Sequence, residues 1–275
     1  MKNPKVTILM ATWNRADCIV RAIESVLAQT FSDWELVVAD DGSTDDTPRI
    51  LETLVKKDGR IKYLKLNHVG RVSVVSNRGL DSGRGEYVAV LDSDDWWSDP
   101  EKLEKQIAFL DSRKEYVGCG GGMIVVDGNG RELYRYFKPR TDEEIRSRML
   151  FGNPIANSAA IFRFSAAASA GFYDESLPYS ADRDFWLKMG LRGKLYNFPE
   201  YFSYYTLSEA STSVAYLKPH LKASLEVMKR YKSDYPNYYP ALVFNYIQYW
   251  YSFLPSGIRR LIHSSLARLK RRVVG

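Results

Sequence analysis

Apolar and polar positions alternate between two kinds of segment along the first hundred residues of the chain. Compact apolar runs, which are typical of strands buried on both faces, occupy residues 6–10, 34–39, 61–66 and 87–91. Between these runs apolar residues recur at helical spacing, as in Ile19, Ile23 and Val26, and again over residues 72–80. Strands that alternate with amphipathic helices predict an α/β fold with a mostly parallel central sheet and flanking helices.

The alternation weakens after Asp99-Pro100, a helix N-cap followed by proline that predicts one more helix of this kind. Further elements are predicted as strands at 120–126 and 157–164, a hairpin turn at 127–130, and helices at 184–192 and 220–231. A soft boundary near Leu217 divides the chain into a main domain, residues 1–217, and a helical, aromatic and basic segment, residues 218–275.

Composition places the chain among ordinary globular proteins, because 45% of its 275 residues are hydrophobic and 26% are charged. Only Cys18 and Cys119 are present, which argues against a disulfide framework and a cysteine-ligated zinc site. No apolar run approaches the roughly 20 residues of a transmembrane helix, and the first residues do not resemble a signal peptide. We therefore expect a cytoplasmic protein.

The net charge of +6 comes from the end of the chain, where no acidic residue follows Asp234. Because the rest of the chain is balanced, nucleic-acid binding by the main domain is not expected. Residues 258–273 have the pattern of a basic amphipathic helix, and aromatic residues precede them at 238–254. Two interpretations stay open, attachment to the inner face of an anionic membrane and packing on protein. The basic residues are Arg259, Arg260, Arg268, Lys270, Arg271 and Arg272.

Polar clusters follow three of the predicted strands, at Thr12–Arg15, Asp40–Ser43 and Asp92–Asp95. In an open parallel sheet, ligands bind where the carboxyl ends of the strands meet the loops. No glycine-rich phosphate loop follows the first two strands. Carboxylates gathered at one strand end suit a hard divalent cation, Mn²⁺ or Mg²⁺, which takes oxygen ligands together with substrate phosphates. The pattern therefore predicts a site for a metal-bound nucleoside diphosphate.

The same residues resemble the family 2 glycosyltransferases, which are inverting enzymes with the A-type nucleotide-sugar fold. The resemblance covers about residues 5–215 and depends on an ordered set of motifs rather than on any single one. The motifs are Val6-Thr-Ile-Leu-Met-Ala-Thr-Trp-Asn-Arg15, Gln29-Thr-Phe, Val37-Val-Ala-Asp-Asp-Gly-Ser-Thr-Asp45, Asn77-Arg-Gly, Gly85-Glu-Tyr-Val-Ala-Val-Leu-Asp-Ser-Asp-Asp95, Gly171-Phe-Tyr-Asp174 and Ala181-Asp-Arg-Asp-Phe-Trp186.

The resemblance implies a role for most of these polar residues. Asp41 would accept a hydrogen bond from the pyrimidine base of a nucleotide-sugar, and Asp94 and Asp95 would hold the metal. Asp182 would be the catalytic base, although alanine stands where the family usually has glutamate before it. The remaining residues expected at the donor site are Ala11, Thr12, Asn14, Asp92 and Ser93.

Several assignments keep an alternative. Arg71 and Arg78 suit phosphate recognition or an exposed helix surface. Asp184 is the nearest rival for the base, and Asp182 has the alternative of a structural pair with Arg183 or Lys188. His220 is a minor candidate for completing the metal site. Residues 149–180 are expected to contact the acceptor, with Asn153 and Ser158 as polar candidates.

The sequence thus predicts an inverting, metal-dependent glycosyltransferase that uses a UDP-sugar, with dTDP- and GDP-sugars as other donors. The expected acceptor is a hydroxyl group of a cell-surface glycan or of a lipid-linked glycan. Two other functions remain as alternatives, a non-catalytic carbohydrate-binding or scaffold protein and a sugar nucleotidyltransferase. The second would require a glycine-rich, basic loop after the first strand, where the chain has Ala11-Thr-Trp-Asn-Arg15.

Overall fold

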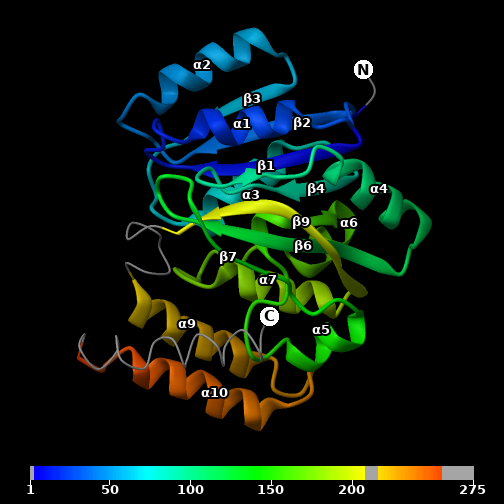
Figure 1. Ribbon diagram of the computed structural model, residues 1–275, viewed down its shortest axis with the longest axis vertical. Coiled ribbons are helices and arrows are strands. Elements are labelled where there is room, and N and C mark those ends of the chain that lie inside the picture. Colours follow the sequence, from blue (N-terminus) through cyan, green and yellow to red (C-terminus); the bar gives the residue numbers. More distant parts are fainter. Residues whose placement is uncertain (1–2, 208–215, 256–275) are drawn as a thin grey trace.

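The structure, a computed structural model, describes residues 3–207 and 216–255. Its first half alternates strands and helices as the apolar pattern predicts (Figure 1). The elements are β1 (Val6–Thr12), α1 (Ile19–Leu27), β2 (Trp34–Asp40), α2 (Thr47–Lys57), β3 (Ile61–Lys65), α3 (Val72–Ser82) and β4 (Tyr87–Val90).

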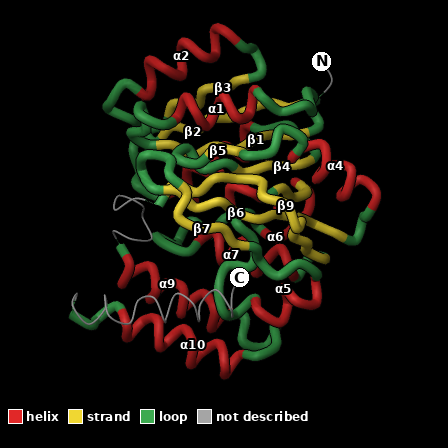
Figure 2. Tube along the Cα trace, viewed as in Figure 1, coloured by secondary structure: helices red, strands yellow, loops and turns green. Residues whose placement is uncertain are grey.

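The second half of the chain is less regular, and strands and helices no longer alternate strictly (Figure 2). Its elements are β5 (Trp96–Trp97), α4 (Lys102–Ser112), β6 (Tyr116–Val126), β7 (Glu132–Tyr136), α5 (Asp142–Arg148), the 3₁₀ helix η1 (Asn157–Ala159), β8 (Ile161–Arg163), α6 (Phe164–Ala170), α7 (Ala181–Gly190), β9 (Lys194–Thr206), α9 (Leu217–Arg230) and α10 (Tyr238–Tyr251).

All the described strands join one sheet in the order β3-β2-β1-β4-β8-β6-β9-β5, with β7 also paired to β6. The four strands β3, β2, β1 and β4 are parallel, which confirms the α/β class. β8 then runs antiparallel to both β4 and β6, while β6 and β9 are parallel to each other. The carboxyl ends of β1, β2 and β4 therefore open on one edge of the sheet.

Alternate residues of the central strands supply two hydrophobic cores, one on each face of the sheet. Ile8 and Met10 of β1 are fully buried in the core that α1 and α4 cover. Leu9 points to the opposite core, which contains residues of α3, α5, α6, α7, α9 and α10. Successive side chains of a strand point to opposite faces, so a strand covered on both sides has the continuous apolar run seen in the sequence.

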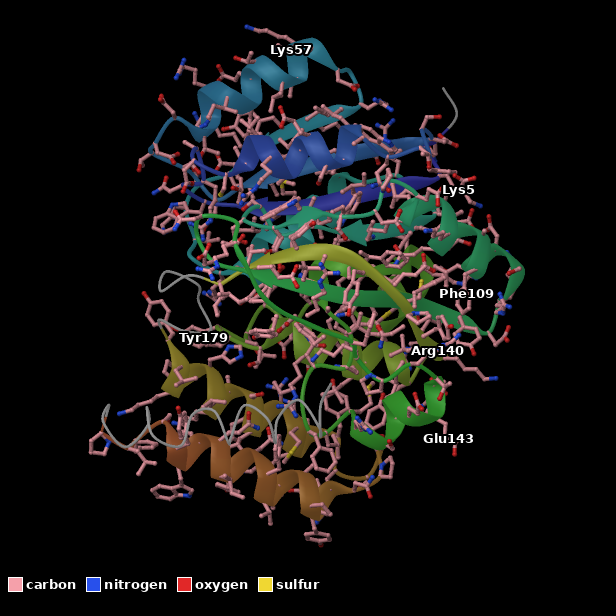
Figure 3. The ribbon with its side chains drawn as sticks, viewed as in Figure 1. Lys5, Lys57, Phe109, Arg140, Glu143 and Tyr179 are labelled. Atoms are coloured by element: carbon pink, nitrogen blue, oxygen red, sulfur yellow. The ribbon has the colours of Figure 1, made fainter. Side chains whose placement is uncertain are left out.

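Helices α9 and α10 lie at the opposite end of the molecule from α2 (Figures 1 and 3). α9 begins at Leu217, and its Leu225 and Met228 belong to the same core as α7. The division of the chain near residue 217 stays a prediction. No helix within residues 3–207 and 216–255 is long and apolar enough to cross a membrane, and the basic amphipathic helix expected at 258–273 falls outside these ranges.

Several segments differ from the predicted elements, and three of them are informative. The strand expected at 157–164 is divided into η1, β8 and the start of α6. β9 is not predicted, because Pro199 interrupts its pattern and its pairing with β6 contains register shifts. α5 is also missed, although Thr141 and Glu144 form the reciprocal capping box that marks a helix start.

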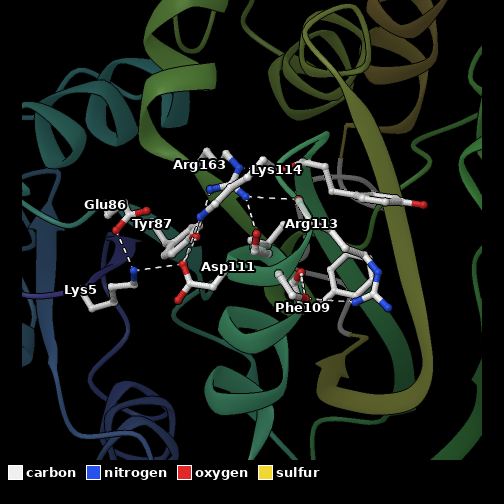
Figure 4. Close-up of polar contacts among 11 residues, drawn as sticks. Lys5, Glu86, Tyr87, Phe109, Asp111, Arg113, Lys114 and Arg163 are labelled. Carbon is white, nitrogen blue, oxygen red and sulfur yellow. Dashed lines mark hydrogen bonds and ion pairs between the residues drawn. The ribbon is translucent and has the colours of Figure 1, made fainter.

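A polar network on Arg163 fixes the C-terminal end of α4 (Figure 4). The guanidinium group donates hydrogen bonds to the backbone oxygen of Leu110, at 2.5 Å, and to the hydroxyl of Tyr87, at 3.0 Å. Tyr87 in turn donates to Asp111, which also pairs with Lys5 at 3.1 Å. A cation at a helix C-terminus satisfies free carbonyls and complements the helix dipole, so Arg163 joins β8 to α4.

Candidate functional site

The three polar clusters lie at neighbouring strand ends. Thr12 at the end of β1 is in register with Asp40 at the end of β2, and the amide of Asp41 donates to the carbonyl of Thr12 at 2.9 Å. β4 pairs with the other edge of β1, and the amide of Leu91 donates to the carbonyl of Leu9. The sequence prediction that these clusters share one edge of the sheet is therefore met.

Asp40 and Asp41 have different environments. Asp40 is fully buried and accepts hydrogen bonds from the Ser43 hydroxyl, at 2.5 Å, and from the Tyr63 hydroxyl, at 2.9 Å. Both oxygens of Asp41 accept backbone amides, from residues 69 and 70, and His68 Nδ1 lies 3.0 Å from one of them. Asp40 thus closes the turn after β2, while Asp41 is held rigidly at the edge of the sheet.

The loop after β1 is joined to the loop after β2. Asn14 has a left-handed backbone, with φ of 51°, and its Oδ1 accepts the amide of Thr44 at 2.8 Å. The Oγ1 of Thr12 is buried without a hydrogen-bond partner among the described residues, and Ala11 is partly buried beside it. Asn14 therefore shapes the site through the backbone of residue 44, and Thr12 retains an unused hydroxyl.

Arg71, at the N-cap of α3, and Arg78, within that helix, have different surroundings. Arg71 donates from Nη1 to the backbone oxygen of Glu175 at 3.0 Å, so its guanidinium group contacts the loop before α7. Asn77 contacts the same loop through the backbone of Tyr173 and the carboxylate of Glu175. Arg78 is exposed on the helix. Arg71 is thus the one of the two that lies against the candidate acceptor region.

The acidic cluster after β4 is held by η1. The Ser158 hydroxyl lies 2.5 Å from Asp95 Oδ2 and 3.3 Å from Asp92 Oδ2, and the backbone amide of Asp92 donates to it at 3.2 Å. Asn157 Nδ2 donates to the other oxygen of Asp92 at 3.1 Å. Ser93 is buried beside the cluster. η1 interrupts the predicted strand at the point where these side chains bind the carboxylates.

Within this cluster Asp94 and Asp95 differ in accessibility. Asp95 is 2% exposed, and the backbone amide of Thr206 donates to its second oxygen at 3.0 Å. Asp94 keeps about a third of its side chain exposed, 32%, and faces the guanidinium group of Arg15 at 3.6 Å. Of the two predicted metal ligands, Asp94 has the accessible carboxylate.

Crowding of carboxylates shifts their proton affinities. Burial, and then the charge of Asp94, raise the pKa of Asp92 to about 7. Burial and the charges of Asp92 and Asp94 raise the pKa of Asp95 well above its ordinary value. The charge of Asp182 also contributes to the shift at Asp92, so Asp182 lies within electrostatic range of the cluster. Acids that repel one another at the edge of a sheet are typical of a binding site for a cation.

Asp182 lies in the first turn of α7 and is partly buried. Its Oδ2 accepts a hydrogen bond from Asn153 Nδ2 at 2.7 Å. Lys188 pairs with Asp184 at 3.2 Å rather than with Asp182. Arg183 donates to Asn245 Oδ1 on α10 at 3.1 Å and to the carbonyl of Leu150, which follows α5, at 2.6 Å. The expected structural partners of Asp182 are therefore engaged elsewhere.

Asp184, the rival for the base, is 1% exposed and joins α7 to α9. It accepts a hydrogen bond from the Tyr231 hydroxyl at 2.8 Å and lies 3.6 Å from Arg230 Nη1. His220, in the first turn of α9, accepts the Ser180 hydroxyl at its backbone oxygen at 3.3 Å, so it adjoins the start of α7. The buried hydrogen bonds of Asp184 assign it to the packing of the two helices.

Sequence reasoning named Asn153 and Ser158 only as polar candidates for the acceptor, and it did not name Asn157, Arg15 or His68 as site residues. The structure places all five against the predicted acids. The position of Arg15 at a strand end was a usable signal. The contacts of residues 153–158 depend on tertiary structure, because they join segments more than 25 positions apart.

Sequence comparison identifies relatives of the chain. Residues 7–169 match the model of glycosyl transferase family 2. The putative glycosyltransferase EpsE of Bacillus subtilis is 32% identical over 210 residues, which are 75% of this chain and 71% of that protein. The Escherichia coli protein described as "UDP-Glc:alpha-D-GlcNAc-diphosphoundecaprenol beta-1,3-glucosyltransferase WfaP" is 36% identical over 122 residues, 44% of this chain and about half of WfaP, 47%.

Solved structures share the fold. Staphylococcus aureus TarS, residues 1–349 in complex with UDP-GlcNAc, superposes with a TM-score of 0.69 at 22% identity, over 94% of this chain and 75% of that one. The mannosyltransferase PcManGT of Pyrobaculum calidifontis, in complex with GDP-Man and Mn²⁺, gives a TM-score of 0.66 at 16% identity, over 97% and 81%. Because the family match covers more than half of the chain and carries the strand-end motifs of this site, the protein is a glycosyltransferase and belongs to glycosyl transferase family 2.

Proposed function

We propose that this glycosyltransferase transfers a sugar from a UDP-sugar to a hydroxyl group of a glycan or lipid-linked acceptor, with inversion at the anomeric carbon. One observation carries the proposal. The short segment 153–158 contacts Asp182 through Asn153 and the acidic cluster through Asn157 and Ser158. The attacking hydroxyl group must lose its proton beside the anomeric carbon from which the diphosphate leaves, so a shared support for the base and the acidic cluster suits such a reaction.

Asp41 is the residue proposed to recognise the nucleotide base. Both its oxygens accept backbone amides, and Oδ1, which His68 does not contact, has a second lone pair for an imide donor. The neighbouring Thr12 hydroxyl is buried without a partner. A preference for UDP is supported by the TarS complex with UDP-GlcNAc and by the donor in the description of WfaP.

The residues of the acidic cluster fit a divalent cation, Mn²⁺ or Mg²⁺. Their side chains offer hard oxygen ligands, and the accessible one belongs to Asp94. No group of three or more His, Cys, Asp or Glu side chains in the described ranges is arranged to hold a metal on its own. The donor's phosphates would therefore supply ligands, and the bound ion would act as a Lewis acid for the leaving diphosphate.

We assign Asp95 a supporting role rather than the ligand role expected from the sequence. Its two oxygens accept hydrogen bonds from Ser158 and from the amide of Thr206, and the residue is buried. Asp92 is partly buried, and its oxygens accept hydrogen bonds from Asn157 and Ser158. Asp92 and Asp94 are then the acids that meet the ribose and diphosphate of the donor, and Asp95 holds the loop that carries them.

Asp182 is proposed to accept the proton of the attacking hydroxyl group. Its hydrogen bond from Asn153 fixes one oxygen and leaves the other for the acceptor. Attack from this side, opposite the diphosphate, produces inversion in one displacement. Arg15, which faces Asp94, would stabilise the negative charge that develops on the leaving group. The anomeric configuration of the product, read by nuclear magnetic resonance, distinguishes inversion from retention.

A lipid-linked acceptor at the inner face of a membrane is supported by two observations. WfaP is described as acting on a diphosphoundecaprenol-linked sugar. The end of this chain carries six basic residues and no acid, a composition that favours anionic lipid surfaces.

The proposal is tested by calorimetric binding of UDP, dTDP and GDP to the purified chain, each with Mn²⁺ and again with EDTA. We expect binding of UDP that requires the ion. Asp94→Asn should weaken this binding at least tenfold, whereas Asp46→Asn, an exposed acid of the α2 terminus, should not change it. Failure of a folded sample to bind any of the three nucleotides would contradict the proposal and favour a non-catalytic role.

A further inference from the structure

Helix α10 has two faces of different character. Its inner face packs on the domain through Ala241, Phe244 and Asn245, which are buried. Asn245 donates to the carbonyl of Leu150 at 3.0 Å, and the ring of Phe244 lies 5.8 Å from that of Phe151. These contacts fix the rotation of the helix about its axis. The opposite face is therefore held outward by packing.

The outer face consists of large apolar and aromatic side chains, and we call it the docking face. Its exposed fractions include 60% for Val243, 45% for Ile247 and 64% for Trp250. The same three residues line a hollow of about 500 Å³. No charged residue occurs within Tyr238–Tyr251. The docking face comprises Tyr239, Val243, Tyr246, Ile247 and Trp250.

Lysines of α9 and of the turn after it lie along one side of this face. Lys218 lies 4.6 Å from the ring centre of Phe253, Lys229 lies 5.8 Å from that of Tyr246, and Lys232 lies 5.8 Å from that of Tyr239. Residues 217–255 contain five basic and two acidic residues, and the twenty residues that follow contain six basic residues and no acid. The docking face therefore has lysines at its border, and the basic residues of 256–275 follow it directly in the sequence.

We infer that the docking face of α10 binds the surface of an anionic lipid bilayer, with its aromatic side chains in the interfacial layer and the surrounding lysines on lipid phosphates. Tyr and Trp favour the boundary between hydrocarbon and headgroups, and a lysine close to an anionic surface adds electrostatic attraction. A second copy of the chain would bring the same lysines against each other. Charge complementarity therefore favours lipid over self-association.

The docking face and Asp182 lie on elements that contact each other. Lys218 and Phe253 place the C-terminal end of α10 beside the start of α9. The backbone of His220, in that first turn, accepts a hydrogen bond from Ser180, which precedes Asp182. Docking would bring the side of the domain that carries Asp182 toward the lipid. This consequence depends on the function proposed above, whereas the lipid contact itself does not.

Flotation with lipid vesicles tests the inference on the full chain. Vesicles of phosphatidylcholine with phosphatidylglycerol are compared with vesicles of phosphatidylcholine alone. We expect binding to the anionic vesicles and a loss of about tenfold or more for the double variant Ile247→Glu, Trp250→Glu, because both changes place a charge in the apolar layer. Leu133→Glu on β7 is the matched control, since Leu133 is 49% exposed on another surface.

Each result has a defined meaning. Equal vesicle binding by the double variant and the wild type would overturn the inference, as would absence of wild-type binding to either vesicle. A wild-type dimer in light scattering that the double variant abolishes, without vesicle binding, would show that the face is a self-interface and would also overturn it. UDP binding with Mn²⁺ is measured on the same samples, so failure of the proposed donor site is seen separately from failure of docking.

Discussion

Asp182 and Asp184 lie two residues apart in the first turn of α7, yet their hydrogen bonds separate their roles. Asp184 is surrounded by Tyr231, Lys188 and Arg230. Asp182 accepts a hydrogen bond from Asn153 at one oxygen and lies within electrostatic range of the acidic cluster. Sequence motifs alone name both. A carboxylate that is 1% exposed and hydrogen-bonded within its own domain is not accessible to a substrate hydroxyl group.

Replacement of Asp182 by Asn is expected to reduce sugar transfer by ~10²- to 10⁴-fold, the range that a general base contributes. Donor binding should stay close to that of the wild type, because the amide is of similar size and can still accept the Asn153 hydrogen bond. Transfer is measured by release of the nucleoside diphosphate, with Asp46→Asn as the control. Wild-type transfer in Asp182→Asn would remove Asp182 as the base.

Ser158 is expected to act as a positioning residue for the acidic cluster. Ser158→Ala removes the hydroxyl between Asp92 and Asp95 and should weaken Mn²⁺-dependent UDP binding by ~10- to 100-fold, as loss of an outer contact to metal-ligating groups does. The readout is the Mn²⁺ concentration that gives half-maximal binding.

The control for Ser158→Ala is Ser73→Ala on α3. That hydroxyl is equally buried and has no hydrogen-bond partner among the described residues, so its loss should leave the Mn²⁺ requirement unchanged. Equal effects of the two changes would show that Ser158 acts only through general stability.

At the scale of elements, α7 and α9 are joined by a polar contact inside an apolar core. The hydroxyl of Tyr231 donates to buried Asp184, whose second oxygen pairs with Lys188. Tyr231→Phe is expected to lower the free energy of unfolding by about 1–3 kcal/mol, because a charged acceptor in the core loses its donor.

The effect is measured by urea denaturation against Tyr239→Phe, an exposed tyrosine of α10. UDP binding should be the same in both variants, since Asp184 does not belong to the donor site. A large loss of UDP binding in folded Tyr231→Phe would contradict the separation of the two acids.

Short sequence motifs explain where some of the helices and strands begin. The capping box of Thr141 and Glu144 marks the start of α5 and would have been enough to predict this helix, which the sequence analysis missed. The division of residues 157–164 into η1 and β8 has another origin, because Asn157 and Ser158 bind carboxylates that follow β4. Hydrogen bonds between distant segments override the strand propensity of these residues. A prediction from neighbouring residues in the sequence cannot detect them.

At the scale of the whole molecule, Lys102 introduces a pH dependence of stability. Its side chain is fully buried, donates to Gln106 Oε1 at 2.8 Å and lies 4.2 Å from the ring centre of Trp97. Burial lowers its pKa from 10.5 to about 7 in the folded state. The unfolded chain therefore binds more protons between these two values, and the free energy of unfolding should rise with pH across that interval.

Lys102→Met is expected to remove this dependence. At pH 7 the variant should be more stable than the wild type by about 1–3 kcal/mol, because a buried ammonium group is replaced by an apolar chain of similar length. The difference should shrink toward pH 10, where the wild-type lysine is neutral. Urea denaturation at both pH values measures it, and a constant difference between them would contradict the shifted pKa.

The sequence by itself determined the α/β class, the family and the position of the acids at strand ends. These features are local: a strand covered on both faces needs a continuous apolar run, and a loop at its end carries its chemistry in consecutive residues. The order of the second half of the sheet was decided by tertiary structure, since β8 and β9 pair with distant strands. So were the burial of Asp184 against α9 and the support of the acids by residues 153–158, because each depends on hydrogen bonds between segments far apart in the chain.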